Sequence, residues 1–352
     1  MLRVNHAVLH VFDFTSCVNV FSQTELDLDD RLAKGYVTKM ARKALTNLDN
    51  MCGEFSPDSL FAPELSVYFR GERDFMGLSI QIAEFIAGEL GRMSKSESTD
   101  LLVVDFEDEE KLAAGATDEE IEASYSGQTR RYFALLLLES RQAYMHAVGS
   151  DDAGTPYNGF ERHHAILPNP SQKISSYAVI DAKTLTVAFQ DKEREIAGER
   201  RWLIPDGLLQ CSMEASSKEV IGEITRIVEE VADEYGANSA VALSKAKAYV
   251  SEQASQGDDI DSDALAREVF GDEPLRERFV EAASAEALPE RVHVEKEAAE
   301  RVVRNHKIRT DTGIEITFLS EYVHNPDFIE FASTPNGMIS IELKNIGHIE
   351  NR

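Results

Sequence analysis

The spacing of the hydrophobic residues changes along this chain, and these changes limit the folds it can adopt. Between residues 220 and 231 the apolar residues recur every three or four positions, which is the period of an amphipathic helix. Gly236 follows and predicts the end of that helix. A second helix is expected over 239–253, and shorter ones after it, so residues 206–305 are predicted to be a helical region. The stripe consists of Val220, Ile221, Ile224, Ile227, Val228 and Val231.

Beyond residue 305 the apolar residues instead alternate with polar ones. Alternation is the period of a strand with one packed and one wet face. Asn336-Gly337 separates the last two runs and predicts a hairpin turn, because both residues tolerate positive φ. Residues 306–352 are therefore predicted to form a small antiparallel β element packed with the helical region. The alternating positions are Ile314, Ile316, Phe318, Ile329, Phe331, Ile339, Ile341 and Leu343.

Residues 1–205 mix both periods. Two short apolar runs predict an opening hairpin, and two helical stripes follow near 28–48 and 72–93. Short connections between successive strand signals favour antiparallel pairing, so we expect an α+β domain with an antiparallel sheet and helices. Residues 202–207 mark its expected end. The strand signals cover 6–13, 18–22, 101–106, 132–139, 143–148, 177–181 and 185–189.

The chain is strongly acidic, with 36 Lys and Arg against 63 Asp and Glu and a net charge of −27 over 352 residues. Both halves share the acidity, since residues 1–205 carry 21 basic and 33 acidic groups and residues 206–352 carry 15 and 30. Such a field repels nucleic-acid phosphate and anionic lipid at long range. Any DNA contact must therefore come from a local basic patch or through a partner.

Several function classes have no support in the sequence. No apolar run approaches the ~18 residues that a membrane helix needs, and we expect neither a secretion signal nor membrane contact. Three scattered cysteines, Cys17, Cys52 and Cys211, favour a reducing compartment. Nucleotide-binding loops, a hydrolase elbow and zinc-ligand spacing are all missing. We expect no catalytic residues, metal or cofactor, and a binding protein rather than an enzyme.

The best basic cluster falls at residues 291–309. Six cations stand there against three acids, so the segment is about +3 in an acidic half. It could touch two or three phosphates, which implies weak, salt-sensitive binding; the alternative is a solvated helix with cations at its C-terminal end. Arg200-Arg201 lies beside Trp202, where an aromatic ring could stack on a base, although packing is the commoner role. The predicted nucleic-acid-binding residues are Arg291, Lys296, Arg301, Arg304, Lys307, Arg309, Arg200 and Arg201.

Three further clusters favour the structural alternative. His163-His164 lacks the partners that a metal site needs. The acids between Asp105 and Glu110 could hold a divalent cation, but a run of acids at a strand end is usually a solvated loop. The string Asp181-Ala182-Lys183 resembles an element of metal-dependent nucleases, but so short a string is common by chance.

Four strings together resemble the bacterial nucleoid-associated protein NdpA family, in an order and spacing that cover nearly the whole chain. Leu319 stands where the family would have a proline, and Asn336-Gly337 replaces the more usual Asp-Gly turn. The resemblance implies a cytoplasmic, nucleoid-associated protein that is connected with double-stranded DNA and with type II topoisomerases. It supplies no catalytic residues. The strings are Asn5-His6-Ala7-Val8-Leu9-His10, His163-His164-Ala165-Ile166-Leu167-Pro168, the run from His306 to Ile316, and the run from Ile341 to Gly347.

Three hypotheses follow. The first is a nucleoid-associated protein that contacts double-stranded DNA, proteins acting on DNA such as topoisomerase subunits, or both. The second is an acidic protein-interaction module, such as a DNA mimic, without direct DNA binding. The third and weakest is a metal-dependent nuclease. A homodimer is compatible with the sequence, since two-fold dimers are the commonest assembly, but nothing in the sequence requires one.

Overall fold

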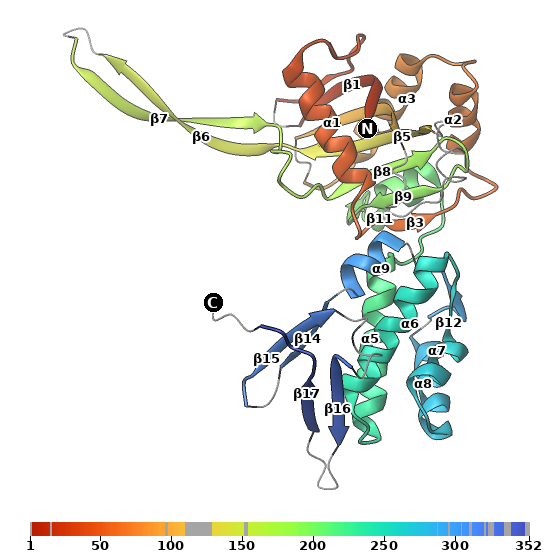
Figure 1. Cartoon of the computed structure of the whole chain (residues 1–352). Helices are drawn as coiled ribbons and strands as arrows, with labels where there is room; N and C mark the ends of the chain where they lie inside the picture. The colour runs from red at the N-terminus through yellow and green to blue at the C-terminus, as the bar shows by residue number, and fades with distance from the viewer. Residues whose placement is uncertain are drawn as a thin grey trace. The chain divides into compact units, whose positions relative to one another are not determined.

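The computed structural model divides the chain into two compact units, residues 1–214 and 215–352. Each unit has its own hydrophobic core, and the elements of each can be followed in Figure 1. The three-part division at residues 205 and 305 stays a prediction. The structure describes residues 2–14, 16–95, 98–109, 129–150, 154–286, 288–294, 296–303, 305–309, 312–319, 322, 327–333 and 339–348.

The first unit is built on a seven-stranded sheet. In spatial order its strands are β2 (Val18–Val20), β1 (Arg3–Asp13), β4 (Thr99–Glu109), β5 (Thr129–Glu139), β8 (Ser176–Asp181), β9 (Val187–Gln190) and β3 (Met51–Gly53). Every neighbouring pair is antiparallel. The predicted opening hairpin is confirmed, because Val11 lies opposite Val20. The predicted antiparallel sheet is confirmed as well.

Helices cover both faces of this sheet, which explains the continuous apolar run in β5. The helix α1 (Arg31–Leu45) packs on the face that contains Leu102 and Val104. The helices α2 (Phe61–Phe69) and α3 (Phe75–Gly91) pack on the opposite face. A strand that is buried on both faces has no wet positions, so its sequence does not alternate.

Aspartates cap the starts of α1 and α3. The Asp30 carboxylate accepts hydrogen bonds from the backbone N–H groups of Leu32 and Ala33, at the start of α1. Asp74 caps α3 in the same way through Gly77. Both helices begin within a few residues of their predicted positions. The sequence did not predict α2, which is only nine residues long and has Pro63 in its first turn.

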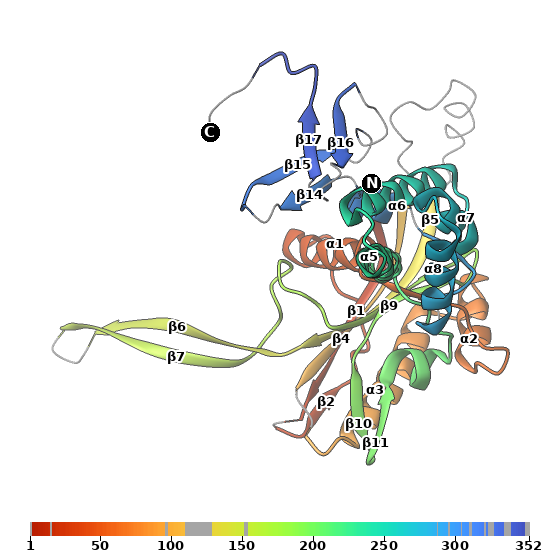
Figure 2. The same ribbon diagram turned by 90° about the horizontal axis from the view of Figure 1, so that it is seen from below.

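Two hairpins complete the first unit. One joins β10 (Glu193–Ile196) to β11 (Glu199–Trp202) and leads into a π-helix, η1 (Leu203–Leu209), whose Leu203 and Ile204 are buried in the core. The other is a long two-stranded ribbon of β6 (Arg141–Ser150) and β7 (Pro156–Ile166). Figures 1 and 2 both show this ribbon projecting away from the seven-stranded sheet.

The second unit contains a helical bundle. Its helices are α5 (Ser217–Glu234), α6 (Ser239–Gln256), α7 (Ser262–Val269), α8 (Glu273–Ala285) and α9 (Lys296–Val303). The predicted stripe of α5 is buried in the bundle core. A capping box starts α5, since Ser216 and Glu219 each satisfy the other's backbone N–H. A short pair, β12 (Ile260–Asp261) and β13 (Arg291–Val292), lies beside the helices.

Two antiparallel hairpins follow the bundle in the chain. One pairs β14 (Asn305–Arg309) with β15 (Glu315–Leu319), and the other pairs β16 (Ile329–Ser333) with β17 (Ile339–Leu343). The segments in which apolar and polar residues alternate thus form paired strands, as predicted. The α+β class is confirmed. The Asn336-Gly337 turn lies outside the described residues.

Candidate nucleic-acid interface

The predicted basic cluster spans three elements of the second unit. Arg291 lies on β13, Lys296 and Arg301 lie on α9, and Lys307 and Arg309 lie on β14. Arg304 lies outside the described residues. The cluster is therefore not a single helical face, as a solvated helix would be, but a helix flanked in sequence by two strands.

Two of these cations are engaged by carboxylates. The Arg291 Nε lies 3.5 Å from Asp261 Oδ2, because β13 pairs with β12. The Lys307 Nζ lies 2.8 Å from Glu315 Oε2 on the neighbouring strand. Both pairs are well exposed, so each contributes little to stability, and phosphate could compete for the cation. Neither cation carries its full charge toward a ligand.

Three other cations of the cluster are better placed to meet a ligand. Lys296, Arg301 and Arg309 are exposed, and none of them forms an ion pair with a carboxylate whose side chain the structure describes. On α9, Ala299 and Val303 lie in the bundle core and Ala298 is also buried, and this packing turns Lys296 and Arg301 toward solvent. Glu300 is exposed on the same helix and dilutes the positive charge.

The arginine pair of the first unit behaves differently. Arg200 on β11 is exposed, whereas Arg201 forms an ion pair with Glu89 of α3. The Arg201 Nε is buried and has no hydrogen-bond partner in the described structure. Arg201 thus ties the β10–β11 hairpin to a helix, and only Arg200 is open to a ligand. The predicted set of cations is split between the two units.

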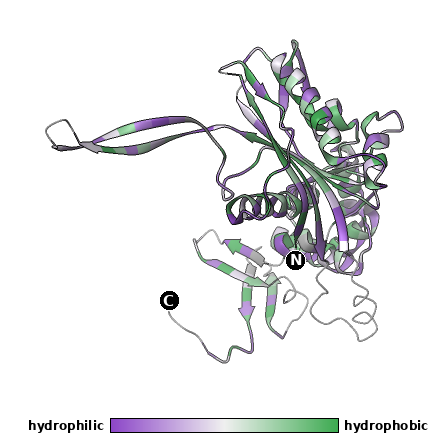
Figure 3. Cartoon of the chain, turned by 90° about the horizontal axis from the view of Figure 1, so that it is seen from above, coloured by the Kyte–Doolittle hydropathy of each residue, from purple (hydrophilic) through white to green (hydrophobic). Residues whose placement is uncertain are grey.

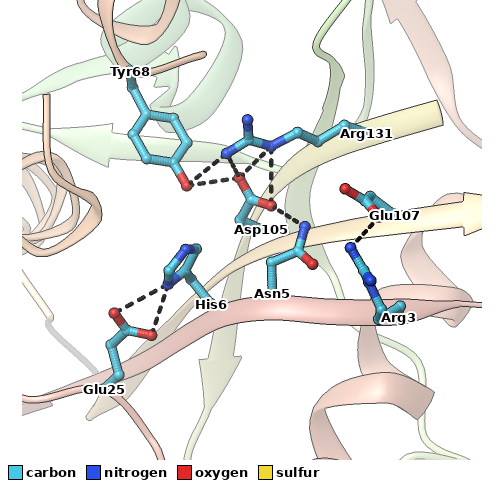
Figure 4. Close-up of polar contacts among 8 residues, drawn as sticks. All are labelled: Arg3, Asn5, His6, Glu25, Tyr68, Asp105, Glu107 and Arg131. Atoms are coloured by element: carbon cyan, nitrogen blue, oxygen red, sulfur yellow. Dashed lines mark hydrogen bonds and ion pairs between the residues drawn. The ribbon is translucent and has the colours of Figure 1, made fainter. Parts of the chain in front are cut away.

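Asp105 of the first unit is heavily hydrogen-bonded, and Figure 4 shows it at the centre of a network. Its carboxylate is fully buried. It accepts hydrogen bonds from Tyr68 Oη at 2.6 Å, Asn5 Nδ2 at 2.9 Å, and Arg131 Nη2 and Nε at 2.7 and 2.9 Å. Arg131 also lies over the rings of Tyr68 and Phe69.

This network corrects one expectation. Residues 105–109 are not a solvated loop, because β4 extends to Glu109 and pairs with β5 along its full length; Glu110, the last acid of the run, lies outside the described residues. Burial and the hydrogen bond to Asp105 raise the pKa of Tyr68 far above its ordinary value, so this hydroxyl stays protonated and donates. Glu107 pairs with Arg3 at 2.7 Å at the wetter end of the strand. The acids thus join strands.

Asp181, the acid of the nuclease-like string, also has a structural role. Arg130 donates to its carboxylate at 2.7 Å, and the backbone N–H groups of Lys183 and Thr184 donate to the other oxygen. Burial alone would raise the pKa of Asp181, but these donors lower it below its ordinary value. The carboxylate closes the turn between β8 and β9. Across the described ranges, no cluster of three His, Cys, Asp or Glu side chains could hold a metal ion.

The sequence contained a signal for the Asp105 network. Arg130 and Arg131 open a strand that follows another strand ending in acids, and antiparallel pairing places Arg131 opposite Glu107. Cross-strand pairs of opposite charge are common in sheets. What the sequence could not show is the burial of Asp105, because burial depends on α2, which carries Tyr68.

The family model described as nucleoid-associated protein YejK matches residues 8–349, which is nearly the whole chain. A comparison with curated proteins finds no match. In the part of the chain that the structure describes, no helix combines the length and hydrophobicity needed to cross a membrane.

Proposed function

The chain belongs to the family of nucleoid-associated protein YejK, and we propose that it binds double-stranded DNA weakly and locally through cations of its second unit. The observation that carries this proposal is the exposure of Lys296, Arg301 and Arg309, none of which pairs with a carboxylate whose side chain the structure describes. Arg304, Arg291 and Lys307 lie in the same segment and would add to the field. Arg200 is a candidate for a separate contact.

The expected strength of this contact follows from its few charges. A protein that neutralises about three phosphates loses affinity with a slope of about −2.7 in log–log salt plots. A rise from about 50 to about 200 mM salt should then weaken binding about 40-fold. The net charge of −27 opposes long-range attraction and lowers the affinity further.

The test is fluorescence anisotropy of a labelled DNA duplex with the full chain at these two salt concentrations. The triple variant Lys296→Ala/Arg301→Ala/Arg309→Ala should lose most of its low-salt affinity. A matched control, Lys218→Ala/Arg267→Ala/Arg278→Ala, removes three cations from other helices of the same unit and should bind like the parent chain. No binding at low salt, or equal losses in both variants, would contradict the proposal.

We further propose that proteins acting on DNA are partners, type II topoisomerase subunits among them. The acidic charge of both halves supports this second proposal, because an acidic chain attracts basic protein surfaces and repels phosphate. Purified topoisomerase subunits should bind the immobilised chain, and binding should weaken as salt rises. If the subunits bind while the duplex does not, the chain is an acidic interaction module and direct DNA contact is wrong.

A further inference from the structure

The helix α1 carries an unbroken run of positive charge. From its start to residue 48 the sequence contains five cations and no acid, in a chain with 36 basic and 63 acidic residues. Five charged residues in succession would rarely all be basic by chance in such a chain. A helix that is merely solvated also tends to mix both signs, since acid–base pairs three or four residues apart stabilise it. The cations are Arg31, Lys34, Lys39, Arg42 and Lys43.

Packing against the sheet leaves these cations on the outer side of α1. Val37 and Met40 are among the apolar residues that α1 buries. Figure 3 shows hydrophilic and hydrophobic residues following one another along the helices of the first unit, as expected where one side of a helix is packed. None of the five cations forms an ion pair with a carboxylate whose side chain the structure describes. Lys43 is half-buried, and Arg31, Lys34, Lys39 and Arg42 are exposed.

The outer side of α1 suits nucleic-acid phosphate better than a lipid surface. No side chain lies within 4 Å of the point where a Cβ of Gly35 would stand, so the middle of this side is open. Leu32, at 82 %, is the one large apolar side chain that α1 leaves well exposed. A helix that lies on a membrane needs a wide apolar face in addition to its cations. Phosphate groups require only the cations.

A loop distant in sequence adds a further cation at the end of α1. The Lys43 ammonium donates to the carbonyl of Pro170 at 3.1 Å and to that of Gln172, which holds this loop against the helix. Lys43 and the exposed Lys173 consequently line one hollow of about 360 Å³. Two ammonium groups with hydroxyl and amide groups beside them offer a seat for a phosphate. The hollow is also lined by Thr46, Asn47, Asp49, Ser171, Ile174 and Tyr177.

Acids flank the start of α1 and limit the useful part of its charge. Asp27, Asp29 and Asp30 precede the helix. The Asp30 carboxylate accepts from the backbone at the helix start, and Asp27 accepts from the N–H of Asp29. These three carboxylates oppose Arg31, so the positive potential is concentrated in the later turns of α1. The α1 surface is therefore defined by Lys34, Lys39, Arg42 and Lys173.

We propose that the α1 surface is a second phosphate-binding site, which contacts the backbone of duplex DNA without reading its sequence. Lys34 and Arg42 lie about 12 Å apart along the helix axis, and a duplex presents one negative charge per ~1.7 Å, so the cations meet different phosphates. The helix contains no Asn or Gln, whose amides read bases. The proposal rests on the proposed function for its ligand, but its cations belong to the other unit.

Lysine acetylation of the full chain, read residue by residue by mass spectrometry, tests the site directly. A duplex at about 50 mM salt should slow acetylation of Lys34, Lys39 and Lys173 at least about threefold, because bound phosphate covers their ammonium groups. The exposed Lys183 of the same unit should react at an unchanged rate. Lys296 reports on the second unit in the same sample, so the two sites are scored separately.

Substitutions then separate charge from folding. In a chain that already carries Lys296→Ala/Arg301→Ala/Arg309→Ala, adding Lys34→Ala/Lys39→Ala/Arg42→Ala should weaken the remaining duplex binding at least about tenfold. Alanine favours helices, so α1 should persist. Lys34→Arg/Lys39→Arg/Arg42→Lys keeps the charge and should bind within about twofold of its parent.

A matched control removes three exposed cations from other segments of the first unit. Arg70→Ala/Lys95→Ala/Lys183→Ala makes the same change in net charge and should leave duplex binding within about twofold. Equal losses in this control and in the α1 variant, or α1 lysines that the duplex does not protect, would overturn the α1 site. Protection of these lysines by phosphatidylserine vesicles but not by the duplex would assign α1 to a lipid surface instead. Protection of α1 without Lys296 would keep the α1 site and contradict the second-unit contact.

Discussion

Replacing Asp105 with Asn should destabilise the first unit more than any exposed substitution in the same sheet. The carboxylate is buried and accepts from three side chains, those of Tyr68, Asn5 and Arg131. The amide has almost the same shape but only one accepting oxygen, and its NH₂ group would face donors. Asp105→Asn thus removes a charge-assisted pair and leaves buried donors without acceptors.

The size of the effect follows from these contacts. Breaking a buried ion pair by removing one partner costs about 3–5 kcal/mol. The guanidinium of Arg131 is about one-third exposed, at 34 %, and water can replace part of what it loses. We therefore expect a loss of about 3 kcal/mol in the free energy of unfolding. For a unit of this size, that lowers Tm by about 6–12 °C.

The chain offers a specific assay for this unit. Its one tryptophan, Trp202, lies on β11 of the first unit. Tryptophan fluorescence during urea unfolding therefore reports on residues 1–214 and not on the helical bundle. Asp105→Asn should move the urea midpoint to lower concentration while the slope stays the same, because the surface exposed on unfolding is unchanged.

Glu107→Gln is the matched control. Glu107 lies two residues further along β4 and pairs with Arg3, whose side chain is 71 % exposed. An exposed pair contributes about 0.2–1 kcal/mol, so this variant should change the midpoint little. If Asp105→Asn costs less than about 1 kcal/mol, or no more than Glu107→Gln, then burial does not make this network important and the reasoning is wrong.

Three further predictions concern other parts of the chain. Ile224→Ala removes a fully buried side chain from the bundle core and should cost about 2–5 kcal/mol, which hydrogen exchange of the α5 amides would detect; unchanged protection would contradict it. Ser216→Ala removes the capping box of α5 and should cost about 1 kcal/mol by the same measurement, with Ser216→Asp retaining most of the stability. Burial, and then the nearby charge of Asp13, raise the pKa of Asp100 to about 6, so the folded first unit favours the protonated form and loses stability as the pH rises from about 4 to about 6. Asp100→Asn should abolish that loss in Trp202 fluorescence, and an unchanged pH profile would contradict the assignment.

The helices of the second unit show what the spacing of hydrophobic residues can predict. The stripe from Val220 to Val231 predicted α5, and every residue of the stripe is buried. The prediction succeeded because an amphipathic helix needs only one buried face, and the sequence itself marks that face. The opening hairpin and the alternating C-terminal strands were predicted on the same basis. The YejK family membership, expected from four short strings, was confirmed.

Short or irregular elements were not predicted from the sequence. The helix α2 and the π-helix η1 are stabilised by packing into the core of the first unit rather than by their own periodicity. The strand β7 was missed because neither face of the ribbon is consistently buried, so its sequence has no regular alternation. The cation cluster at 291–309 stays a prediction as a binding site, and the sequence could not show that Arg291 and Lys307 would lie beside carboxylates.

The sequence by itself determined the α+β class, the bundle helix α5, the acidic charge and the family, because each depends on residue types and their spacing along the chain. Only the tertiary structure decided which charges are available to a ligand. Asp105 became a buried partner of Arg131 because β4, β5 and α2 meet there, and apolar side chains on both faces of the β6–β7 ribbon were left exposed. Whether a charged side chain is available to a ligand depends on which segments, distant in sequence, pack beside it. The local sequence does not contain that information.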